Sequence, residues 1–474
     1  MKSHKTQKTL VTFYGDDFTG TAASAEALTA SGMPTIILTE PLPGDKLFER
    51  FPDIKAVGIA GTTRTMTCDQ LDETLKRVFM DLKDYRSPVF LYKVCSTFDS
   101  SPEIGSIGKA IEIGKNVFST RIVPVLPAAP RLGRFTVFGH HFAALGQTSI
   151  HRLDRHPSMM KHPVTPMNES DLLIHLSKQT SLKSGLINIF DLDRGEKHVL
   201  SLLNEFVNDG ISIALFDCLY ERHLMLASKV MRKFVSQNES IFISGSQELG
   251  YGLSHAFAES GDFEIPAGIH TDIAGTIKRP LFVISGSCAT VTGEQILWAK
   301  NNGFMDVELK PGDLLQAKGH DLYLEQIIDV IIRHLSNNNP VIVHTAIGMD
   351  DPRIGIFEKR ARALSLSREQ ANEMLGNALG EITQKVVEHT SLKRLVVMGG
   401  DTSGRVQKYL DINALQVAKS IGIAAPVCYA YSRKKYINGM EIVFKGGQIG
   451  SVNYLGEVQN AKTIPFEECS LEVI

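Results

Sequence analysis

The chain has 474 residues, more than one core of ordinary size accommodates, so we expect two or three domains. Its 50 Lys and Arg residues nearly balance 52 Asp and Glu residues, and a formal charge of -2 is not the basic footprint of a protein that binds nucleic acid or a membrane surface. Hydrophobic residues make up 43% and charged residues 22%, which is typical of a globular protein.

The six cysteines are scattered along the chain without a CxxC spacing. Residues 1–10 are basic but lack the apolar core of a signal peptide, and the apolar runs are too short to span a bilayer. We therefore expect a cytoplasmic protein with reduced thiols and no structural zinc.

Apolar strand candidates alternate with segments of helical period through the first half of the chain. The first strand, Val11–Tyr14, ends in the turn Gly15-Asp16-Asp17-Phe18-Thr19-Gly20, and a helix pattern follows over 22–30. Further strands are expected at 35–38, 56–60, 89–93 and 121–125, with helices at 71–82 and 107–117. This alternation predicts a mainly parallel sheet covered by helices on both faces.

A polar segment rich in His and Pro, 151–168, interrupts this rhythm, and we expect a long functional loop or hairpin there rather than core. Strands resume at 184–189, 211–217 and 240–244. Residues 261–280 then carry glycine, proline and charge without periodicity, and we place a linker at 263–280.

Beyond this linker, strands are expected at 281–285, 306–309, 340–345 and 394–399, helices at 323–335 and 368–389, and a closing hairpin from 425–431 and 442–445. The predicted fold class is α/β, with two α/β domains of mainly parallel sheets flanked by helices. The N-terminal domain spans 1–262 and the C-terminal domain 281–474.

The first strand ends in two adjacent carboxylates, Asp16 and Asp17. In open α/β sheets, ligands bind beyond the carboxyl ends of the strands. Two acids at such a position are costly unless they pair, hold a metal or meet a ligand. The alternative is that one of them only caps the helix that follows.

Cations, hydroxyls and further acids follow other strands of the first half, namely Arg64 within Thr62-Thr63-Arg64, the run Lys93 to Ser100 with Ser96 and Asp99, Arg131, Arg134, His140-His141 and His162. Arginine or lysine suits a carboxylate, and Asp, Ser and Thr suit hydroxyls, so this set fits a small polyhydroxy acid. Each residue also has a plain explanation: a solvated charge for Arg64 or Lys93, packing for the paired histidines, loop ordering for His162. A metal site of two histidines with Asp154 is the less favoured alternative, because the spacing is not a recognised one.

Three glycine- and hydroxyl-rich turns follow apolar strands in the second half: Ser285-Gly286-Ser287-Cys288-Ala289-Thr290, Gly399-Gly400-Asp401-Thr402-Ser403-Gly404 and Lys445-Gly446-Gly447-Gln448-Ile449-Gly450. Glycine lets backbone amides approach a phosphate, helix N-termini favour anions, and hydroxyls and a lysine add donors. None of the turns is a Walker motif or a GxGxxG motif. Three of them in one domain predict a nucleotide-phosphate site.

These motifs, taken together, resemble the four-carbon acid sugar kinase family. Residues 15–20 resemble its DDxTG opening, 93–108 its K-x-x-S-T-[FL]-D-S…GNIG block, 127–134 its P-A-x-P-x-x-G-R strand end and 162–167 the HPVxPM loop of its 3-oxo-tetronate kinase branch. The three turns of the second half resemble its S-G-S-C, GG[DE]TSG and K-x-G-x-[IF]-G motifs. The seven motifs occur in the same order over nearly the whole chain.

The resemblance implies a cytoplasmic ATP- and Mg²⁺-dependent kinase that phosphorylates the terminal hydroxyl of a four-carbon acid, 3-oxo-tetronate, D-erythronate or D-threonate, giving the 4-phosphate. It implies that domain 1–262 binds the acid sugar and domain 281–474 the nucleotide, with the active site in the cleft between them. It implies catalytic roles for Asp17 and Lys93, and Asp16 is an open alternative to Asp17 as the base. Substrate would contact Asp16, Thr19, Arg64, Ser96, Asp99, Arg134 and His162. ATP would contact Ser285, Gly286, Ser287, Gly399, Gly400, Asp401, Thr402, Ser403, Lys445, Gly446, Gly447 and Gln448, with Asp401 meeting the magnesium of Mg-ATP.

The sequence departs from the family motifs at Ser106, where Asn is usual, at Gly447-Gln448 and at Leu132-Gly133, which leaves the acid substrate open. Two other function classes stay open: a nicotinamide-dependent dehydrogenase, because glycine turns also hold pyrophosphate, and a sugar-acid sensor without catalysis. The expected partners are an acid sugar and ATP, without nucleic acid or membrane. A homodimer is compatible with the sequence.

Overall fold

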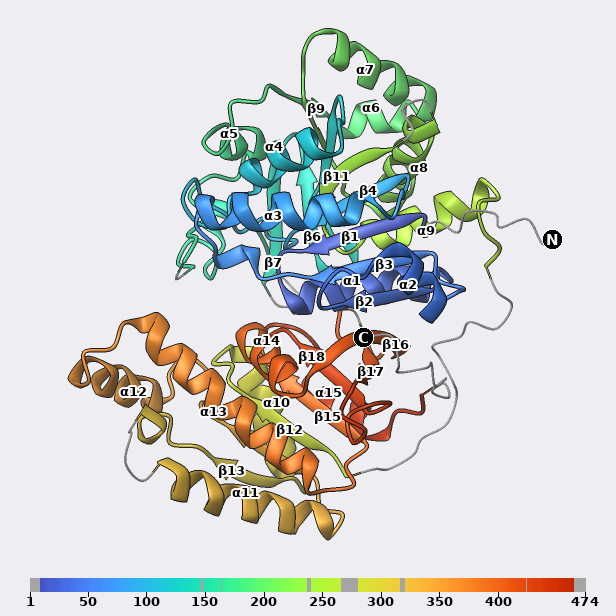
Figure 1. The fold of residues 1–474 in the computed structure, drawn as a ribbon. Helices are drawn as coiled ribbons and strands as arrows, with labels where there is room; N and C mark the ends of the chain where they lie inside the picture. The colour runs from blue at the N-terminus through green and yellow to red at the C-terminus, as the bar shows by residue number, and fades with distance from the viewer. Residues whose placement is uncertain are drawn as a thin grey trace, which may run out of the picture. The chain divides into compact units, whose positions relative to one another are not determined.

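The computed structural model (Figure 1) describes residues 9–145, 149–162, 164–236, 240–265, 280–315, 320–422 and 424–463. The chain divides into two compact units, Met1–Ile269 and His270–Ile474, called here the N-terminal and C-terminal units. The linker expected at 263–280 lies largely outside the described residues, and its boundaries stay a prediction.

The N-terminal unit is built on a parallel sheet in the order β2-β3-β1-β4-β11-β5-β10-β9. Its strands are β1 Val11–Gly15, β2 Thr35–Leu38, β3 Ala56–Ala60, β4 Val89–Lys93, β5 Val123–Leu126, β9 Ser184–Ile187, β10 Ile213–Phe216 and β11 Ile241–Gly245. The central strands β1, β4 and β11 are buried along their whole length, because helices cover both faces. The expected parallel α/β sheet is confirmed.

Helices α3 and α4 pack together, and α1 packs on α9, which packs on α8 (Figure 1). The amphipathic α3 shows how such a layer forms, because its buried residues Leu71, Leu75, Val78, Phe79 and Leu82 recur at helical spacing and a Thr67–Gln70 capping box starts it. The helices of this unit are α1 Phe18–Ala30, α2 Gly44–Arg50, α3 Cys68–Lys83, α4 Ile107–Val117, α5 Leu172–Ser177, α6 Ile189–Asp193, α7 Glu196–Asn208, α8 Glu221–Ser236 and α9 Leu249–Glu259.

A separate three-stranded antiparallel sheet, β6 Arg134–Val137, β7 His140–Leu145 and β8 Ser149–Arg152, follows β5. The segment 151–168 was expected to form a loop or hairpin outside the core. Its first two residues complete the β7–β8 hairpin, but its Leu153, Met159 and Met167 are buried in a small cluster with Ala143, so part of it does belong to a core. Its polar composition conceals this cluster, because only three apolar side chains are needed to form it.

The C-terminal unit has a mixed sheet in the order β13-β14-β12-β15-β18-β17-β16. The first five are parallel, and β17 pairs antiparallel with both β18 and β16. The strands are β12 Phe282–Ser285, β13 Met305–Glu308, β14 Val341–His344, β15 Arg394–Met398, β16 Ile412–Lys419, β17 Val427–Ser432 and β18 Glu441–Lys445. The expected hairpin of β17 and β18 is present, whereas β16 was not expected.

Helices α10 Thr290–Asn301 and α15 Tyr454–Asn460 contact each other and share one hydrophobic cluster with the sheet. Helices α11 His320–Ser336 and α14 Gly400–Tyr409 each pack on α13 Arg368–Glu388, and α12 Pro352–Ala363 also contacts α13. Among the helices of the described ranges, none combines the length and apolar character needed to cross a membrane.

A buried ion pair ties β15 to β18 and to the end of α15. Arg394 Nε donates to Glu441 Oε2 at 2.8 Å, and Arg394 also donates to the carbonyls of Val458 and Ala461. The Arg394 side chain is 0% exposed and that of Glu441 is 3% exposed. The charges lie side by side because the register places Arg394 opposite Glu441.

Glu441→Gln should destabilise the C-terminal unit by about 3–5 kcal/mol, because it leaves the buried guanidinium without its counter-charge. Urea unfolding followed by the fluorescence of Trp298, the chain's one tryptophan, reports on this unit. Glu381→Gln is the matched control, since it breaks the half-exposed helix pair with Lys385 and should cost under about 0.5 kcal/mol. Equal stability of the two variants would contradict the prediction.

Candidate active site

Three neighbouring strands of the N-terminal unit end level with one another. The register places Gly15 of β1 opposite Ala60 of β3 and Lys93 of β4. The residues that leave these strands, Asp16-Asp17, Arg64 and Lys93, therefore meet at the carboxyl edge of the sheet, where α/β proteins bind ligands. Two backbone bonds fix this edge, Gly61 N to Gly15 O and Arg64 N to Asp16 O.

These residues form a quartet of two acids and two cations. Arg64 donates to both carboxylate oxygens of Asp16 at 2.9 and 3.0 Å, and its Nη1 lies 2.9 Å from Asp17 Oδ2. Lys93 Nζ lies 3.6 Å from an oxygen of each aspartate. The four formal charges cancel, so the quartet stays intact at the sheet edge without an external counter-ion.

The two aspartates differ in exposure and partners. Asp16 is 5% exposed and held by the bidentate Arg64, whereas Asp17 is 21% exposed. Asp17 is also the N-cap of α1, accepting from Gly20 N at 2.8 Å and Thr19 Oγ1 at 3.0 Å. The capping alternative is therefore correct for Asp17, and it coexists with the place of Asp17 in the quartet.

Electrostatics keep Asp17 ionised. Burial alone would raise the pKa of Asp17, but Arg64, Lys93 and the bonds from Thr19 and Gly20 lower that pKa to about 2. An Asp17 carboxylate of this kind accepts hydrogen bonds at any physiological pH and is a weak proton acceptor.

The loop after β4 carries Ser96 and Asp99 beside the quartet. Phe98, buried, adopts a left-handed conformation with φ of +57°, which is strained for a bulky residue. Thr97 Oγ1 donates to Asp99 Oδ1, and Ser96 O is 2.8 Å from His141 Nε2. Burial lowers the pKa of His141 to about 4, so His141 is neutral and packs rather than carrying charge.

Arg134 has few partners of its own. Its Nη1 donates to Leu132 O, its buried Nε has no hydrogen-bond partner, and no ion pair of the described residues includes it. Burial lowers the pKa of Arg134, although the negative charges of nearby Cys95 and Asp99 would raise it. An underpaired guanidinium of this kind suits a ligand carboxylate.

His162 lies apart from this group in its hydrogen bonding. Its Nδ1 is 3.0 Å from both N and Oγ1 of Thr165, so the ring orders its own loop. The described hydrogen bonds do not join it to the quartet. Asp154 pairs with Arg152 and Arg155.

In the C-terminal unit, the three glycine turns converge. Gly399 N donates to Lys445 O at 2.8 Å, which joins the second turn to the third. A Cβ on Gly286 would lie 2.3 Å from Thr402 Oγ1, and a Cβ on Gly447 would lie 2.6 Å from Ser287 Oγ. The loops approach this closely only because glycine stands at these positions.

The helices that leave the first two turns begin without a side-chain cap. Ala289 precedes α10 and Gly399 precedes α14, and neither end carries a side-chain cap hydrogen bond. Helices α3 and α13 begin with capping boxes, whereas α7 and α9 also lack a side-chain cap, so the starts of α10 and α14 are distinguished by the glycine turns beside them. Backbone amides that are left open at the starts of two helices are suited to binding an anion.

The acid expected to meet magnesium, Asp401, is exposed at the start of α14. No hydrogen bond or ion pair of the described residues involves its carboxylate, which leaves its oxygens available to a hydrated Mg²⁺. Gly400 beside it is equally open, since a Cβ there would meet nothing within 4 Å.

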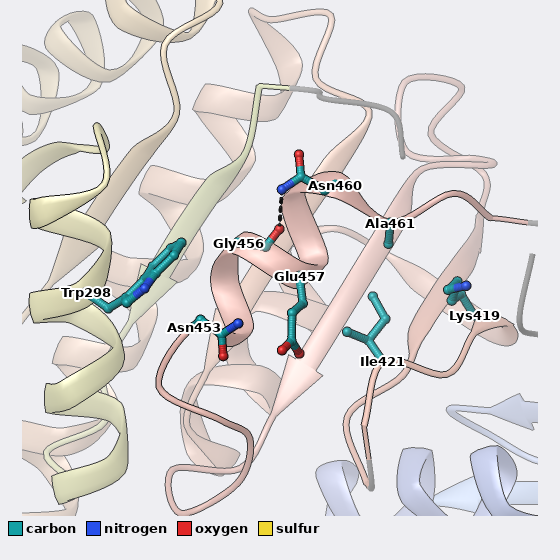
Figure 2. A pocket seen from close by; sticks show the side chains of 8 residues that line it. All are labelled: Trp298, Lys419, Ile421, Asn453, Gly456, Glu457, Asn460 and Ala461. Atoms are coloured by element: carbon teal, nitrogen blue, oxygen red, sulfur yellow. Dashed lines mark hydrogen bonds between the residues drawn. The ribbon is translucent and has the colours of Figure 1, made fainter. Parts of the chain in front are cut away.

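Two other features of the C-terminal unit lie outside the turns. Figure 2 shows a pocket of about 510 Å³ beside α15, lined by Trp298, Lys419, Ile421, Asn453, Gly456, Glu457, Asn460 and Ala461, and no residue of the three turns lines it. Asp306, Glu308 and His344 have metal-type ligand atoms within 4.8 Å of one another. Lys300 pairs with Asp306 at 2.6 Å and with Glu308 at 3.2 Å, and His344 lies 2.8 Å from Asp306, so a network of ion pairs and hydrogen bonds accounts for this cluster.

Comparisons with known proteins agree with this division. Residues 11–253 match the model of a sugar-binding N-terminal domain and residues 282–455 that of a nucleotide-binding C-terminal domain. A 3-oxo-isoapionate kinase of Paraburkholderia graminis is 37% identical over 454 residues, covering 96% of this chain and 94% of that protein. The chain belongs to the four-carbon acid sugar kinase family.

More distant relatives extend the comparison. A 3-oxo-tetronate kinase of Methylobacterium radiotolerans is 27% identical over 451 residues, covering 93% of this chain and 96% of that protein. The structure of a Salmonella typhimurium protein described as a putative tRNA synthase superposes with a TM-score of 0.76. The match covers 95% of this chain and 98% of that chain. At 23% identity, this similarity shows the fold alone. The chain is thus a carbohydrate kinase acting on a sugar acid, in place of the dehydrogenase and sensor alternatives.

Some residues of the acid sugar kinase sites were not expected from the sequence. His175 and Gln179 of the α5 region each lie 2.9 Å from Ser100 Oγ, and they brace the loop that carries Asp99. Their signal is weak, because they lie more than 70 residues from that loop in the chain. By contrast, the lack of a side-chain cap on α10 and α14 follows from the residue types, because Ala289 and Gly399 have no side-chain oxygen to accept a hydrogen bond.

Gly20→Ala should disable the quartet, because the added Cβ would lie 1.8 Å from Lys93 Nζ and 2.3 Å from Asp17 Oδ1. Lys93 is 3% exposed and has little room to move away. We expect kinase turnover to fall by about 10²-fold or more, as misplaced catalytic groups do. The control is Gly44→Ala in α2, whose Cβ would meet nothing within 4 Å and which should keep full turnover.

Proposed function

We propose that this kinase transfers the γ-phosphoryl group of ATP to the terminal hydroxyl of a 3-oxo four-carbon sugar acid or a near relative of it. The uncapped starts of α10 and α14, converging on three glycine turns, carry the nucleotide half of this proposal. The names of the two relatives, 3-oxo-isoapionate kinase and 3-oxo-tetronate kinase, share the 3-oxo acid and support the acid half.

In the N-terminal unit, we assign the substrate hydroxyl to Asp17, the partly exposed acid, and a bracing role to the buried Asp16. Phosphoryl transfer passes through a loose transition state, so little basicity is needed. Asp17, with a pKa of about 2, therefore orients the hydroxyl and receives its proton late. Arg64 and Lys93 offset the charge of the moving group, and Arg134 holds the acid's carboxylate.

In the C-terminal unit, the open amides of α10 and α14 hold the phosphates of ATP, with Ser285, Ser287, Thr402 and Gln448 as side-chain donors. Mg²⁺ supplied with ATP neutralises phosphate charge, and Asp401 holds one of its waters. We assign the acid to the N-terminal unit and the nucleotide to the C-terminal unit. We therefore propose that both units take part in one ternary complex during turnover. A homodimer and a cytoplasmic location stay predictions.

The direct test measures ADP release from Mg-ATP with a panel of acids: 3-oxo-tetronate, 3-oxo-isoapionate, D-erythronate and D-threonate. As a negative control, NAD replaces Mg-ATP, and we expect no NADH to form with any of these acids. We expect release with at least one 3-oxo acid. Asp17→Asn should lower kcat on that acid by about 10²- to 10⁴-fold with ATP affinity unchanged. Unchanged kcat would remove Asp17 from its role, and no release with any acid of the panel would refute the proposed substrate class.

Gly400→Val should weaken Mg-ADP binding by about tenfold or more, since its side chain would fill the open space at the start of α14 and block charge-assisted amide bonds. Calorimetric titration measures this. Gly355→Val is the matched control, because it also lies in a helix, α12, with nothing within 4 Å of its Cβ. Wild-type affinity in Gly400→Val would place the phosphates elsewhere.

A further inference from the structure

Lys445 is the last residue of β18 and the first residue of the third glycine turn, and it is 0% exposed. Its Nζ makes one hydrogen bond, to Gly446 O at 2.7 Å. No ion pair of the described residues includes it. This differs from the other end of the same strand pair, where the buried Arg394 has its carboxylate partner Glu441.

The elements that pack on β18 are β15, β17 and α14. The charged groups of these elements and of β18 itself are Arg394, Asp401, Arg405, Lys408 and Glu441. Their other titratable groups are Tyr409, Cys428, Tyr429 and Tyr431. No hydrogen bond or ion pair of the described residues joins any of them to the Lys445 amine, and burial lowers the pKa of Lys445 to about 7.

A buried ammonium without a counter-charge is costly, so the free protein holds Lys445 partly as the neutral amine near pH 7. The site above it is built for anions: Gly399 N bonds to Lys445 O, and the uncapped α10 and α14 start at the adjoining turns. A polyphosphate bound there would be the missing counter-charge. It would restore the preference of the amine for its charged form.

We propose that nucleotide binding to this kinase is coupled to the uptake of one proton by Lys445. The inference rests on the proposed nucleotide site. The proton comes from solvent and goes onto the Lys445 amine, and no other bond changes. Binding then weakens as pH rises above the pKa of the free amine, because the proton must be taken from an increasingly dilute source.

The test is titration calorimetry of Mg-ADP into the full chain, in two buffers of different ionisation enthalpy, at about pH 8, where nucleotide phosphates are already ionised. The difference in apparent enthalpy gives the number of protons taken up. We expect uptake approaching one proton per nucleotide in the wild type, and an affinity that falls by up to about tenfold per pH unit above pH 7.

Three variants test whether Lys445 is the group that takes up the proton. Lys445→Arg keeps a permanent charge and should bind Mg-ADP without proton uptake and with little pH dependence. Lys445→Met should bind more weakly, also without uptake. Lys408→Met, on the exposed side of α14, should behave as the wild type. Circular dichroism checks that each variant is folded.

Wild-type binding without proton uptake, or unchanged uptake in Lys445→Arg, would overturn the proposal while leaving the nucleotide site in place. Absence of any Mg-ADP binding in the wild type would instead refute the proposed site, and the coupling with it. The two failures are therefore distinct.

Discussion

A parallel sheet brings the carboxyl ends of its strands to one edge, and the structure of both sites depends on this constraint. Strands that are buried on both faces supply no polar partners of their own, so the turns beyond them must satisfy every group placed there. In the N-terminal unit, charged side chains from three turns satisfy one another as Asp16, Asp17, Arg64 and Lys93. In the C-terminal unit, the turns leave backbone amides open.

This difference in electrostatics fits the division of labour between a sugar-binding and a nucleotide-binding domain. The quartet is neutral as a whole, so it does not attract polyphosphate strongly, and its partly exposed oxygens on Asp17 suit hydroxyl groups. The glycine turns present open backbone amides, hydroxyls and a lysine, with Asp401 as their one acid, and this donor set suits an anion bound with a cation.

Local sequence patterns were sufficient for most strands of the parallel sheets, the turns after them and the family, but not for the antiparallel strands β6, β7, β8 and β16. The apolar runs ending in Asp16, Lys93, Ser285 and Met398 each became a buried strand with its polar turn. The split between a buried Asp16 and a more exposed Asp17 could not be predicted, because it arises from Arg64, 48 residues away. The isolation of Lys445 and the packing of Met159 and Met167 likewise depend on contacts distant in sequence.

The weak basicity of Asp17 also has a structural reason. The cations that hold the two adjacent carboxylates together necessarily lower the pKa of Asp17, because they favour its charged form. A strongly basic aspartate at this position would require the loss of Arg64 or Lys93, and with it the quartet. In the role proposed for Asp17, the same arrangement would orient a hydroxyl without deprotonating it early, and the hydroxyl would be less reactive until a phosphoryl group is within reach. The geometry thus favours a reaction in which positioning, and not proton abstraction, does most of the catalysis.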